Sequence, residues 1–599
     1  MNDLRRALPY ARPYRRPIAL GLVLVALSNV AGILLPWLLG RAIDAMSRDG
    51  ISMRLIVEQA ALIVGTAIVS GAARFGMRQL LNGVSRRIEV DLRDDVFHHM
   101  LHLDAGFFGR MPTGELMSRL TNDTQAVRMA IGPGVMYMMN TAVTAVLALA
   151  VMIGYNPRLT LFSVLPMLLL PPVMVYFGRA IHRRFERIQQ HFGVLSTMVQ
   201  ENLSGVRIVR AYGQESAQEA EFEALNQEYF DRNMALARTS ALFHPLLAVL
   251  TGIGILAVLW LGGLDVMTGR NTPGEFVAFF FYLGQLAWPM IAIGWVINLF
   301  QRGSASMGRI ALILDAEPAV PEPEHPVMIS QPRGEVEFRD VWFRYPGTER
   351  DVLRGVSLRI PAGETAAIVG PTGSGKSTIV ALLTRRHDPT RGQVLLDGVP
   401  LDRISFQQLR ALIALVPQDA FVFSDTIAEN IALGLPHGVE RNGRIEHAAD
   451  IARLSETIAG FPDGFNTRLG ERGVNLSGGQ RQRATLARAI ARDARVLILD
   501  DSLSAVDTQT ETEILRGLSD VIARRTALII SHRVSAVMNA DRIFVLDNGT
   551  IIERGTHTEL VESRGLYASL LRRQLLSDTL DDGTGAASDA FQRAESGTE

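Results

Sequence analysis

The chain of 599 residues contains no cysteine, so by itself it forms no disulfide, carries no thiol nucleophile and ligates no iron–sulfur cluster. An excess of charge of one sign is also missing. The 60 basic and 61 acidic residues give a net charge of −1, which provides no overall field for binding nucleic acid. Lysine is almost absent. Lys376 is the single lysine, and the other basic residues are arginine. This single lysine marks a position where a compact point charge suits the chemistry better than a planar guanidinium.

The lone lysine stands in a segment that matches the phosphate-binding pattern G-x-x-x-x-G-K-[ST]. An apolar run, 364–369, precedes it as a predicted buried strand, and 378–383 follows as a predicted helix. Small residues let successive backbone N–H groups surround the phosphates of a nucleotide at the helix N-terminus. The lysine is then expected to reach the β- and γ-phosphates, and the serine after it to ligate Mg²⁺. The segment consists of Gly370, Pro371, Thr372, Gly373, Ser374, Gly375, Lys376 and Ser377, with Thr378 next.

The first half of the chain is rich in long apolar stretches. Hydrophobic residues make up 48% of the sequence, and its mean hydropathy is +0.17. Six stretches approach the roughly 20 residues that a helix needs to cross a bilayer. They predict an all-α membrane domain of six helices, with the lipid bilayer as a partner. The stretches are Ile18–Ala42, Leu55–Leu80, Ile131–Tyr155, Leu159–Ile181, Leu242–Met267 and Phe276–Phe300.

The loops between these stretches alternate in length and charge. The second and fourth loops are long and rich in arginine, which places them and the N-terminus in the cytoplasm. Their helical periodicity indicates that the membrane helices continue into the cytosol. Residues 1–16 are expected to form an interfacial cytoplasmic segment, with an amphipathic helix from about Leu4 to Arg15. No cleavable signal peptide is expected, because the apolar run that follows is long enough to span a membrane.

Polar side chains within the six stretches are few, chiefly Asn29, Asn140, Gln285 and Asn298. Intramembrane polar groups indicate either a functional site or hydrogen bonds between helices, and the second interpretation is favoured for uncharged amides. No pair of intramembrane acids stands out, which argues against an ion-coupled transporter. Apolar spans with scattered amides and aromatics suit a small hydrophobic or amphipathic substrate.

The second half of the chain has a different pattern. Prolines concentrate in 317–334, which predicts a semi-rigid linker after the membrane domain, 17–316. Short β-rich runs then alternate with helices over 335–572, which is typical of an α/β domain. Residues 573–599 are polar and acidic, and we expect them to be disordered.

Two further motifs lie in the α/β half. The apolar strand Val496–Asp500 ends in a carboxylate, about 120 residues after the phosphate loop, where an acid of the Mg²⁺ shell is expected. A second anion-binding loop opens a helix about 20 residues before that strand. One γ-phosphate does not need both loops from one chain, so the second is expected to cap a nucleotide bound by another chain. It consists of Leu476, Ser477, Gly478, Gly479 and Gln480.

With these motifs the chain resembles the ATP-binding cassette (ABC) transporters, whose signature is LSGGQ. The membrane domain comes first and one cassette follows, as in half-size exporters of the multidrug and lipid type. The resemblance implies binding of ATP and Mg²⁺ and ATP-driven export across the cytoplasmic membrane. Transport would occur by alternating access, with the N-terminus and the cassette in the cytoplasm.

The resemblance also assigns roles to single residues. Tyr345 resembles the aromatic that stacks on adenine, and Gln418 the loop glutamine that contacts Mg²⁺ or water. Asp507 resembles the acid of the loop along the dimer interface, and His532 the switch histidine that contacts the γ-phosphate. The expected magnesium ligands are Ser377, Gln418 and, through water, Asp500.

One residue departs from the family pattern. The family usually has Glu directly after the strand-ending acid, where it activates the attacking water, and here that residue is Asp501. Aspartate is one methylene shorter, so its carboxylate falls short by about 1 Å, and such a misplacement can cost about 100-fold in rate. Tight ATP binding and slow hydrolysis are therefore expected at this chain's own site. This favours a heterodimer with a second half-transporter that carries the Glu.

Alternatives remain open at this point. The chain could form a homodimeric exporter that uses Asp501 as a slow base. It could also be a membrane receptor or channel that ATP binding regulates, without pumping a substrate. A soluble cassette ATPase acting on DNA is disfavoured by the six spans, and no nucleic-acid partner is expected. A cassette importer is disfavoured because its membrane domain is generally a separate chain.

Overall fold

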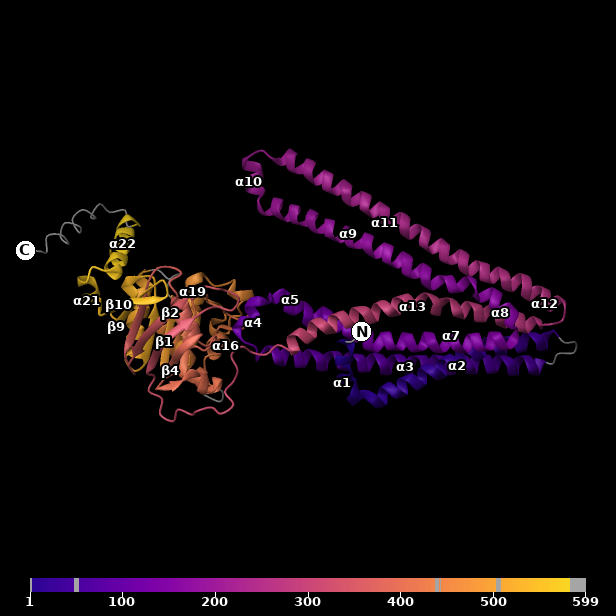
Figure 1. Cartoon of the computed structure of the whole chain (residues 1–599), viewed down its shortest axis with the longest axis horizontal. Helices are drawn as coiled ribbons and strands as arrows, with labels where there is room; N and C mark the ends of the chain where they lie inside the picture. Colours follow the sequence, from indigo (N-terminus) through magenta and orange to yellow (C-terminus); the bar gives the residue numbers. More distant parts are fainter. Residues whose placement is uncertain (1–2, 48–52, 437–440, 442, 503–507, 582–599) are drawn as a thin grey trace, which may run out of the picture. The chain divides into compact units, whose positions relative to one another are not determined.

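The computed structural model describes residues 3–47, 53–436, 441, 443–502 and 508–581. The chain divides into two compact units (Figure 1). The first unit comprises Met1–His102 and Pro112–Ala316, and the second comprises Leu103–Met111 and Glu317–Glu599.

The first unit is helical and confirms the predicted all-α membrane domain. Among the described residues, six helical rods of 42 to 53 residues are long and apolar enough to cross a membrane. At 1.5 Å per residue they extend about 63–80 Å, more than twice the roughly 30 Å of a bilayer core. Each rod therefore continues outside the bilayer. The rods are Asp3–Met46, Met53–Met100, Thr113–Tyr155, Pro157–Ser204, Glu215–Met267 and Pro273–Leu314.

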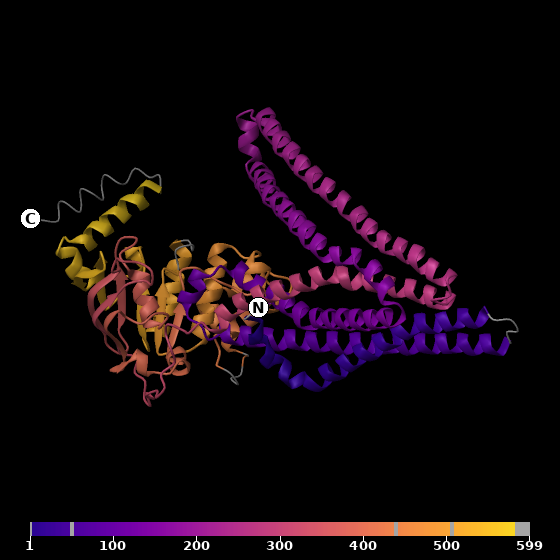
Figure 2. The same cartoon turned by 45° about the vertical axis from the view of Figure 1, so that its right-hand side comes forward.

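The rods pack as neighbours within this unit. Helix α2 packs on α3, α7 and α13, and α9 lies beside α11 (Figure 1, Figure 2). The main helices are α2 (Arg15–Met46), α3 (Met53–Met100), α7 (Val135–Tyr155), α9 (Leu170–Ser204), α11 (Glu215–Ala257) and α13 (Pro273–Leu314). Shorter helices are α5 (Thr113–Ser118), α6 (Thr124–Met129), α8 (Pro157–Val164), α10 (Val206–Ala211) and α12 (Gly263–Met267).

The intramembrane amides make hydrogen bonds between these helices. Asn29 Nδ2 donates to Asn140 Oδ1 at 3.0 Å, and Gln285 Nε2 donates to the carbonyl of Gly32 at 3.3 Å. The Asn298 amide oxygen accepts from Arg302 on the same helix. Three of the four amides thus hold helix against helix, in agreement with the favoured interpretation.

The N-terminal segment differs from the predicted single helix. It forms three short pieces, η1 (Asp3–Ala7), α1 (Leu8–Ala11) and η2 (Arg12–Tyr14), before α2 begins. Pro9 and Pro13 each lack an N–H and interrupt the α-helical hydrogen-bond ladder, which explains the breaks.

The second unit is an α/β domain built on two sheets. A four-stranded antiparallel sheet has the order β2-β1-β4-β5, and a six-stranded, mostly parallel sheet has the order β10-β9-β3-β8-β7-β6. The strands are β1 (Val336–Phe343), β2 (Leu353–Ile360), β3 (Thr365–Val369), β4 (Arg391–Leu396), β5 (Val399–Pro400), β6 (Ile413–Val416), β7 (Val496–Asp500), β8 (Thr526–Ile530), β9 (Arg542–Asp547) and β10 (Thr550–Gly555). The helices are α4 (Ala105–Arg110), α14 (Lys376–Leu383), α15 (Phe406–Leu412), α16 (Ile427–Ala432), α17 (Arg444–Ile451), α18 (Ser455–Ala459), α19 (Gly478–Ala491), α20 (Thr508–Ile522), α21 (His557–Glu562) and α22 (Leu566–Asp581).

Strand β3 separates two hydrophobic cores. Ala366 and Ile368 face the core shared with the antiparallel sheet and α14, while Ala367 and Val369 face the core formed with α17 and α19. This alternation follows from the two-residue period of a strand. Because both faces are covered, β3 reads as a continuous apolar run, as predicted.

The C-terminal boundary was predicted too early. Helix α22 continues to Asp581, so residues 573–581 are helical rather than irregular. Leu570 and Leu571 pack on the hydrophobic core, and Gln574 Oε1 accepts a hydrogen bond from the Val534 N–H at 2.6 Å. These contacts hold the helix in place beyond the point where its composition becomes polar. The rest of the predicted tail, 582–599, lies outside the described residues.

Candidate active site

The phosphate loop joins β3 to α14 in the middle of the six-stranded sheet. Gly375 is the residue before α14 and has a φ of +107°, a left-handed conformation that favours glycine. A Cβ atom at this position would come within 2.8 Å of Leu353. Lys376 Nζ donates to the carbonyls of Gly370 and Pro371 at 2.8 and 2.9 Å. The lysine is therefore held over its own loop.

The loop residues fit a phosphate group. The Ser374 hydroxyl is buried and has no hydrogen-bond partner among the described residues. Gly373 has a φ of +81°, and a Cβ added there would meet no atom within 4 Å. Burial lowers the pKa of Lys376, against the opposing effect of Asp501 and Asp500. An anion in the loop would give the serine hydroxyl a partner and would pair with the charge of the half-buried ammonium.

Four neighbouring parallel strands end at the same edge of the sheet. They lie in the order β3, β8, β7 and β6, with Ile368 beside Ile530, and Ile530 beside Asp500. The phosphate loop, His532, the two acids and Gln418 follow these strands. The register therefore brings together residues that are up to about 160 positions apart in the sequence.

Asp500 lies between the phosphate loop and the second acid. Its side chain is buried, and its Oδ1 accepts a hydrogen bond from the Ser377 hydroxyl at 3.4 Å. Burial, and then the charge of Asp501, raise the pKa of Asp500. No group of three metal-ligating acids or histidines occurs among the described residues. The Ser377 hydroxyl and the Asp500 carboxylate supply two oxygens that suit Mg²⁺ with phosphate and water as its other ligands.

Asp501 connects the predicted catalytic residues. Its Oδ1 lies 2.7 Å from His532 Nδ1, and its Oδ2 accepts a long hydrogen bond of 3.5 Å from Gln418 Nε2. Its backbone N–H donates to the Ile530 carbonyl at 2.8 Å. Asp501 has a φ of +47°, a region that aspartate enters more readily than most residues. The three candidate catalytic side chains therefore form one cluster.

Tyr345 lies at the other side of the phosphate loop. Its ring contacts Phe343 edge-to-face at 4.9 Å and His387 at 5.4 Å, and its hydroxyl is 3.2 Å from the Thr378 hydroxyl. The tyrosine is thus attached to the helix that follows the loop, and its role as an adenine platform stays a prediction.

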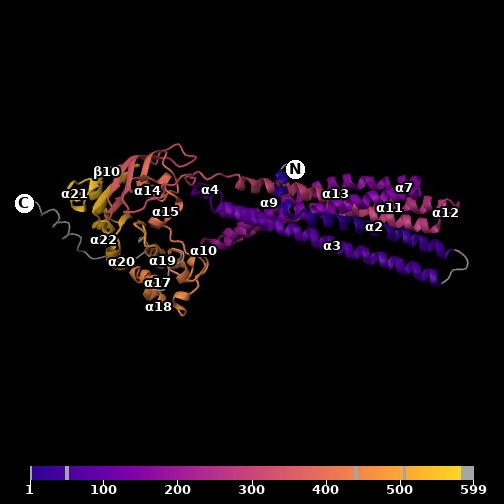
Figure 3. The same ribbon diagram turned by 90° about the horizontal axis from the view of Figure 1, so that it is seen from below.

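The second anion-binding loop lies on a different part of the domain. Ser477 caps α19: its hydroxyl accepts from the Gln480 N–H at 3.2 Å, and the Gln480 side chain accepts from the Ser477 N–H at 2.9 Å. Leu476 is buried and anchors the loop, while Gly478 and Gly479 form the first turn. Figure 3 shows α19 apart from α14. Asp507 lies outside the described residues.

Some side chains at the site were not found from the sequence. Glu511 and Arg533 form a part-buried ion pair of 2.6 Å beside Asp501. Elsewhere in the second unit, Asp104 accepts from the Gly106 N–H and, with its other oxygen, from the Ala319 N–H at 2.7 and 2.6 Å, which joins the start of α4 to the segment that follows residue 316. An aspartate before a short helix signals an N-cap, but no local signal pairs residues that are 22 or 215 positions apart.

A six-helix membrane domain joined to a phosphate-loop domain with a second anion-binding loop defines an ATP-driven transporter. The family model described as "ABC transporter transmembrane region" matches residues 18–290, and the model described as "ABC transporter" matches residues 353–504. The chain belongs to the ABC transporter family, as an exporter half-transporter with fused membrane and ATP-hydrolysing domains.

Relatives cover nearly the whole chain. A probable multidrug resistance ABC transporter ATP-binding/permease protein, YheI of Bacillus subtilis, is 37% identical over 96% of this chain and 98% of its own length. The multidrug resistance-like ATP-binding protein MdlA of Escherichia coli is 36% identical over 96% of both chains. An ATP-dependent lipid A-core flippase of Chromohalobacter salexigens is 35% identical over 95% of this chain and 97% of its own.

A solved structure shows the same fold. The structure of a bacterial Atm1-family ABC exporter with ATP bound superposes with a TM-score of 0.77 and 28% identity, over 94% of this chain and 99% of that chain. These comparisons make the protein an ATP-driven exporter of the multi-pass inner-membrane class.

Proposed function

We propose that this chain is the slow-hydrolysing subunit of a heterodimeric exporter for a hydrophobic or amphipathic molecule. The observation that carries the proposal is Asp501. It occupies the position of the water-activating base, is one methylene shorter than the Glu usual in the family, and has both oxygens engaged by His532 and Gln418. A short carboxylate held in this way is drawn back from an attacking water.

The other residues are suited to bind ATP well. Lys376 and the loop N–H groups would hold the β- and γ-phosphates, and Ser377 and Asp500 would hold Mg²⁺, which neutralises charge on the phosphates when bound. His532 would contact the γ-phosphate, and Tyr345 the adenine. This chain's site would thus bind ATP tightly and hydrolyse it slowly.

The Ser477 loop would complete the partner's site. ATP held between the phosphate loop of one chain and the signature loop of the other favours the closed pair of cassettes by differential affinity. Closure would turn the membrane helices outward, and hydrolysis at the partner's base would reset the cycle. The N-terminus and the cassette would lie in the cytoplasm, because arginine is concentrated in the long loops.

The substrate class rests on the membrane unit and on the relatives. Many large apolar side chains of the six rods are exposed on the single chain, including Leu20, Val23 and Trp260. The relatives are named for multidrug resistance and for lipid A-core. Both the apolar helices and the names of the relatives favour a hydrophobic or amphipathic molecule as the substrate.

The composition of the complex tests the heterodimer. The tagged chain is expressed in its native host, extracted gently and weighed as an intact assembly by mass spectrometry. We expect a second, different chain of similar size that carries Glu at the equivalent position. An assembly of identical copies would show that Asp501 is the working base of a homodimer.

A separate measurement tests pumping itself. Sealed vesicles that contain the complex are expected to accumulate a hydrophobic dye only with ATP and Mg²⁺. Passive flow that ATP opens, without accumulation against a gradient, would instead indicate a regulated channel or receptor.

A further inference from the structure

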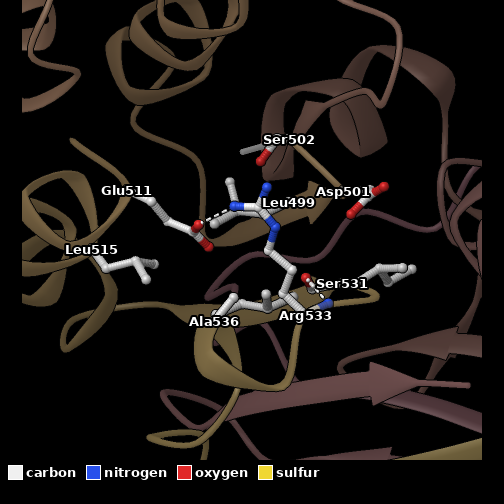
Figure 4. Close-up of a pocket in the computed structure, with 10 residues that line it drawn as sticks. Leu499, Asp501, Ser502, Glu511, Leu515, Ser531, Arg533 and Ala536 are labelled. Carbon is white, nitrogen blue, oxygen red and sulfur yellow. Dashed lines mark hydrogen bonds and ion pairs between the residues drawn. The ribbon is translucent and has the colours of Figure 1, made fainter. Parts of the chain in front are cut away.

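A part-buried ion pair with a buried carboxylate lies beside the catalytic cluster. Arg533 NH1 donates to Glu511 Oε2 at 2.6 Å, and the Glu511 side chain is only 5% exposed. Arg533 follows His532 in the sequence, and Glu511 lies in the first turn of α20. Figure 4 shows the guanidinium of Arg533 reaching between Glu511 on one side and Asp501 and Ser502 on the other.

The surroundings of the pair are mostly apolar. A small cavity of about 20 Å³ is lined by the pair and by Leu499, Leu515 and Ile529, among other residues. A buried carboxylate is stable only with a partner, and removal of one partner leaves an uncompensated charge. Glu511 and Arg533 are therefore expected to stay together when either segment moves.

The ion pair attaches the segment that carries His532 to α20, in addition to the contact of His532 itself with Asp501. The Arg533 N–H donates to the Ser531 hydroxyl at 2.9 Å, and the Val534 N–H donates to Gln574 of α22 at 2.6 Å. Glu511 accepts a hydrogen bond from the side chain of Arg533, the residue that directly follows His532. Because the Cα atoms of His532 and Arg533 are only 3.8 Å apart along the chain, the position that Glu511 gives Arg533 constrains the position of the neighbouring imidazole.

We propose that Glu511 is a positioning residue for ATP hydrolysis: through Arg533 it holds His532 at Asp501. Glu511 would not touch nucleotide, and its effect would be on the catalytic step. This inference rests on the ATPase activity of the family and does not depend on whether the partner is a second copy or a different chain.

The test compares three variants in the assembled transporter, in wild type and in a D501E background in which hydrolysis at this site is expected to be faster. E511Q removes the charge and leaves Arg533 in place. We expect single-turnover hydrolysis of the ATP held by this chain's phosphate loop to slow about 10- to 100-fold, with the affinity of that site for ATP changed less than about twofold. The matched control is E513Q, on the same helix, whose carboxylate is 43% exposed and lies 3.7 Å from Arg453. It should leave both constants unchanged.

A second variant separates positioning from folding. The double substitution E511L/R533M replaces the pair by apolar side chains, which often preserves or increases stability. We expect this variant to unfold at or above the wild-type temperature and to bind ATP normally, yet to hydrolyse it as slowly as E511Q. A wild-type rate of single-turnover hydrolysis in the double variant would overturn the proposal. An equal loss of ATP binding and of hydrolysis in both variants would also overturn it, because the pair would then be structural only.

Discussion

At the scale of single residues, the proposed slow site rests on the length of one side chain, that of Asp501. Replacement of Asp501 by Glu restores the missing methylene and moves the carboxylate about 1 Å toward the water position. We expect D501E to raise the ATPase kcat of this chain's site about 10- to 100-fold, with ATP affinity unchanged. Single-turnover hydrolysis measures the effect. D501N is the control, because it has the length of Asp without a base. A D501E rate equal to that of wild type would show that carboxylate length is not limiting.

Asp500 illustrates a residue whose charge serves binding at the expense of stability. Its pKa is raised by burial and by Asp501, so the folded protein binds its proton more readily than the unfolded chain. Stability from this group therefore increases as pH falls through the folded pKa and is reduced at neutral pH. We expect D500N without nucleotide to melt about 2–4 °C higher while losing the stabilisation that ATP and Mg²⁺ confer. Calorimetry at pH 7 with and without the ligands checks both. A lower melting temperature without ligands would contradict the sign.

The same shift predicts a pH dependence of ligand binding. In the proposed role of Asp500, Mg²⁺ needs its ionised carboxylate, and a raised pKa means that this carboxylate becomes protonated at a higher pH than an ordinary aspartate. Mg²⁺-dependent ATP binding should therefore begin to weaken at a higher pH than it would with an aspartate of ordinary pKa. ATP binding that does not depend on Mg²⁺ should change less over the same pH range. ATP binding measured from pH 8 to pH 5, with and without Mg²⁺, distinguishes the Mg²⁺-dependent from the Mg²⁺-independent binding.

At the scale of elements, Asp44 holds the end of α2 to the start of α13. Its two oxygens accept hydrogen bonds from the Gly274 N–H at 2.7 Å and from the Thr272 hydroxyl at 2.6 Å. The backbones also approach closely there, since a Cβ on Gly40 would lie 2.6 Å from the Gly274 carbonyl. We expect D44A to lower the melting temperature in detergent by about 2–4 °C. D44N keeps one acceptor oxygen and should lose less. Equal losses in both variants would place the effect in the charge rather than in these bonds.

At the scale of the whole molecule, each chain is expected to contribute its signature loop to the other chain's nucleotide. S477A should therefore reduce hydrolysis at the partner's site strongly and leave ATP binding by this chain's phosphate loop unchanged. The lost helix cap costs about 1 kcal/mol by itself. S405A is the matched control, because Ser405 caps α15 in the same way by accepting from the Gln408 N–H. A similar loss of activity in S405A would mean that S477A acts only through stability.

The fold class and most of the site could be predicted from local patterns. Apolar stretches of about 20 residues predict membrane helices because bilayer thickness sets their length. The phosphate loop, the signature loop and the strand ending at Asp500 are contiguous motifs, so their chemistry is visible in the sequence. Two boundaries were less accurate: Pro9 and Pro13 break the N-terminal helix, and contacts of Gln574 extend the last one.

By itself the sequence determined that this is an ABC half-exporter with Asp501, rather than the Glu usual in the family, after its strand-ending acid, because those features lie in short, contiguous motifs. Only the tertiary structure decided how the motifs meet. The register of β3, β8, β7 and β6 brings His532 and Gln418 to the two oxygens of Asp501. It also places Glu511 against Arg533. Such pairings depend on strand order and helix packing between distant segments, and the spacing of the residues along the chain does not encode them.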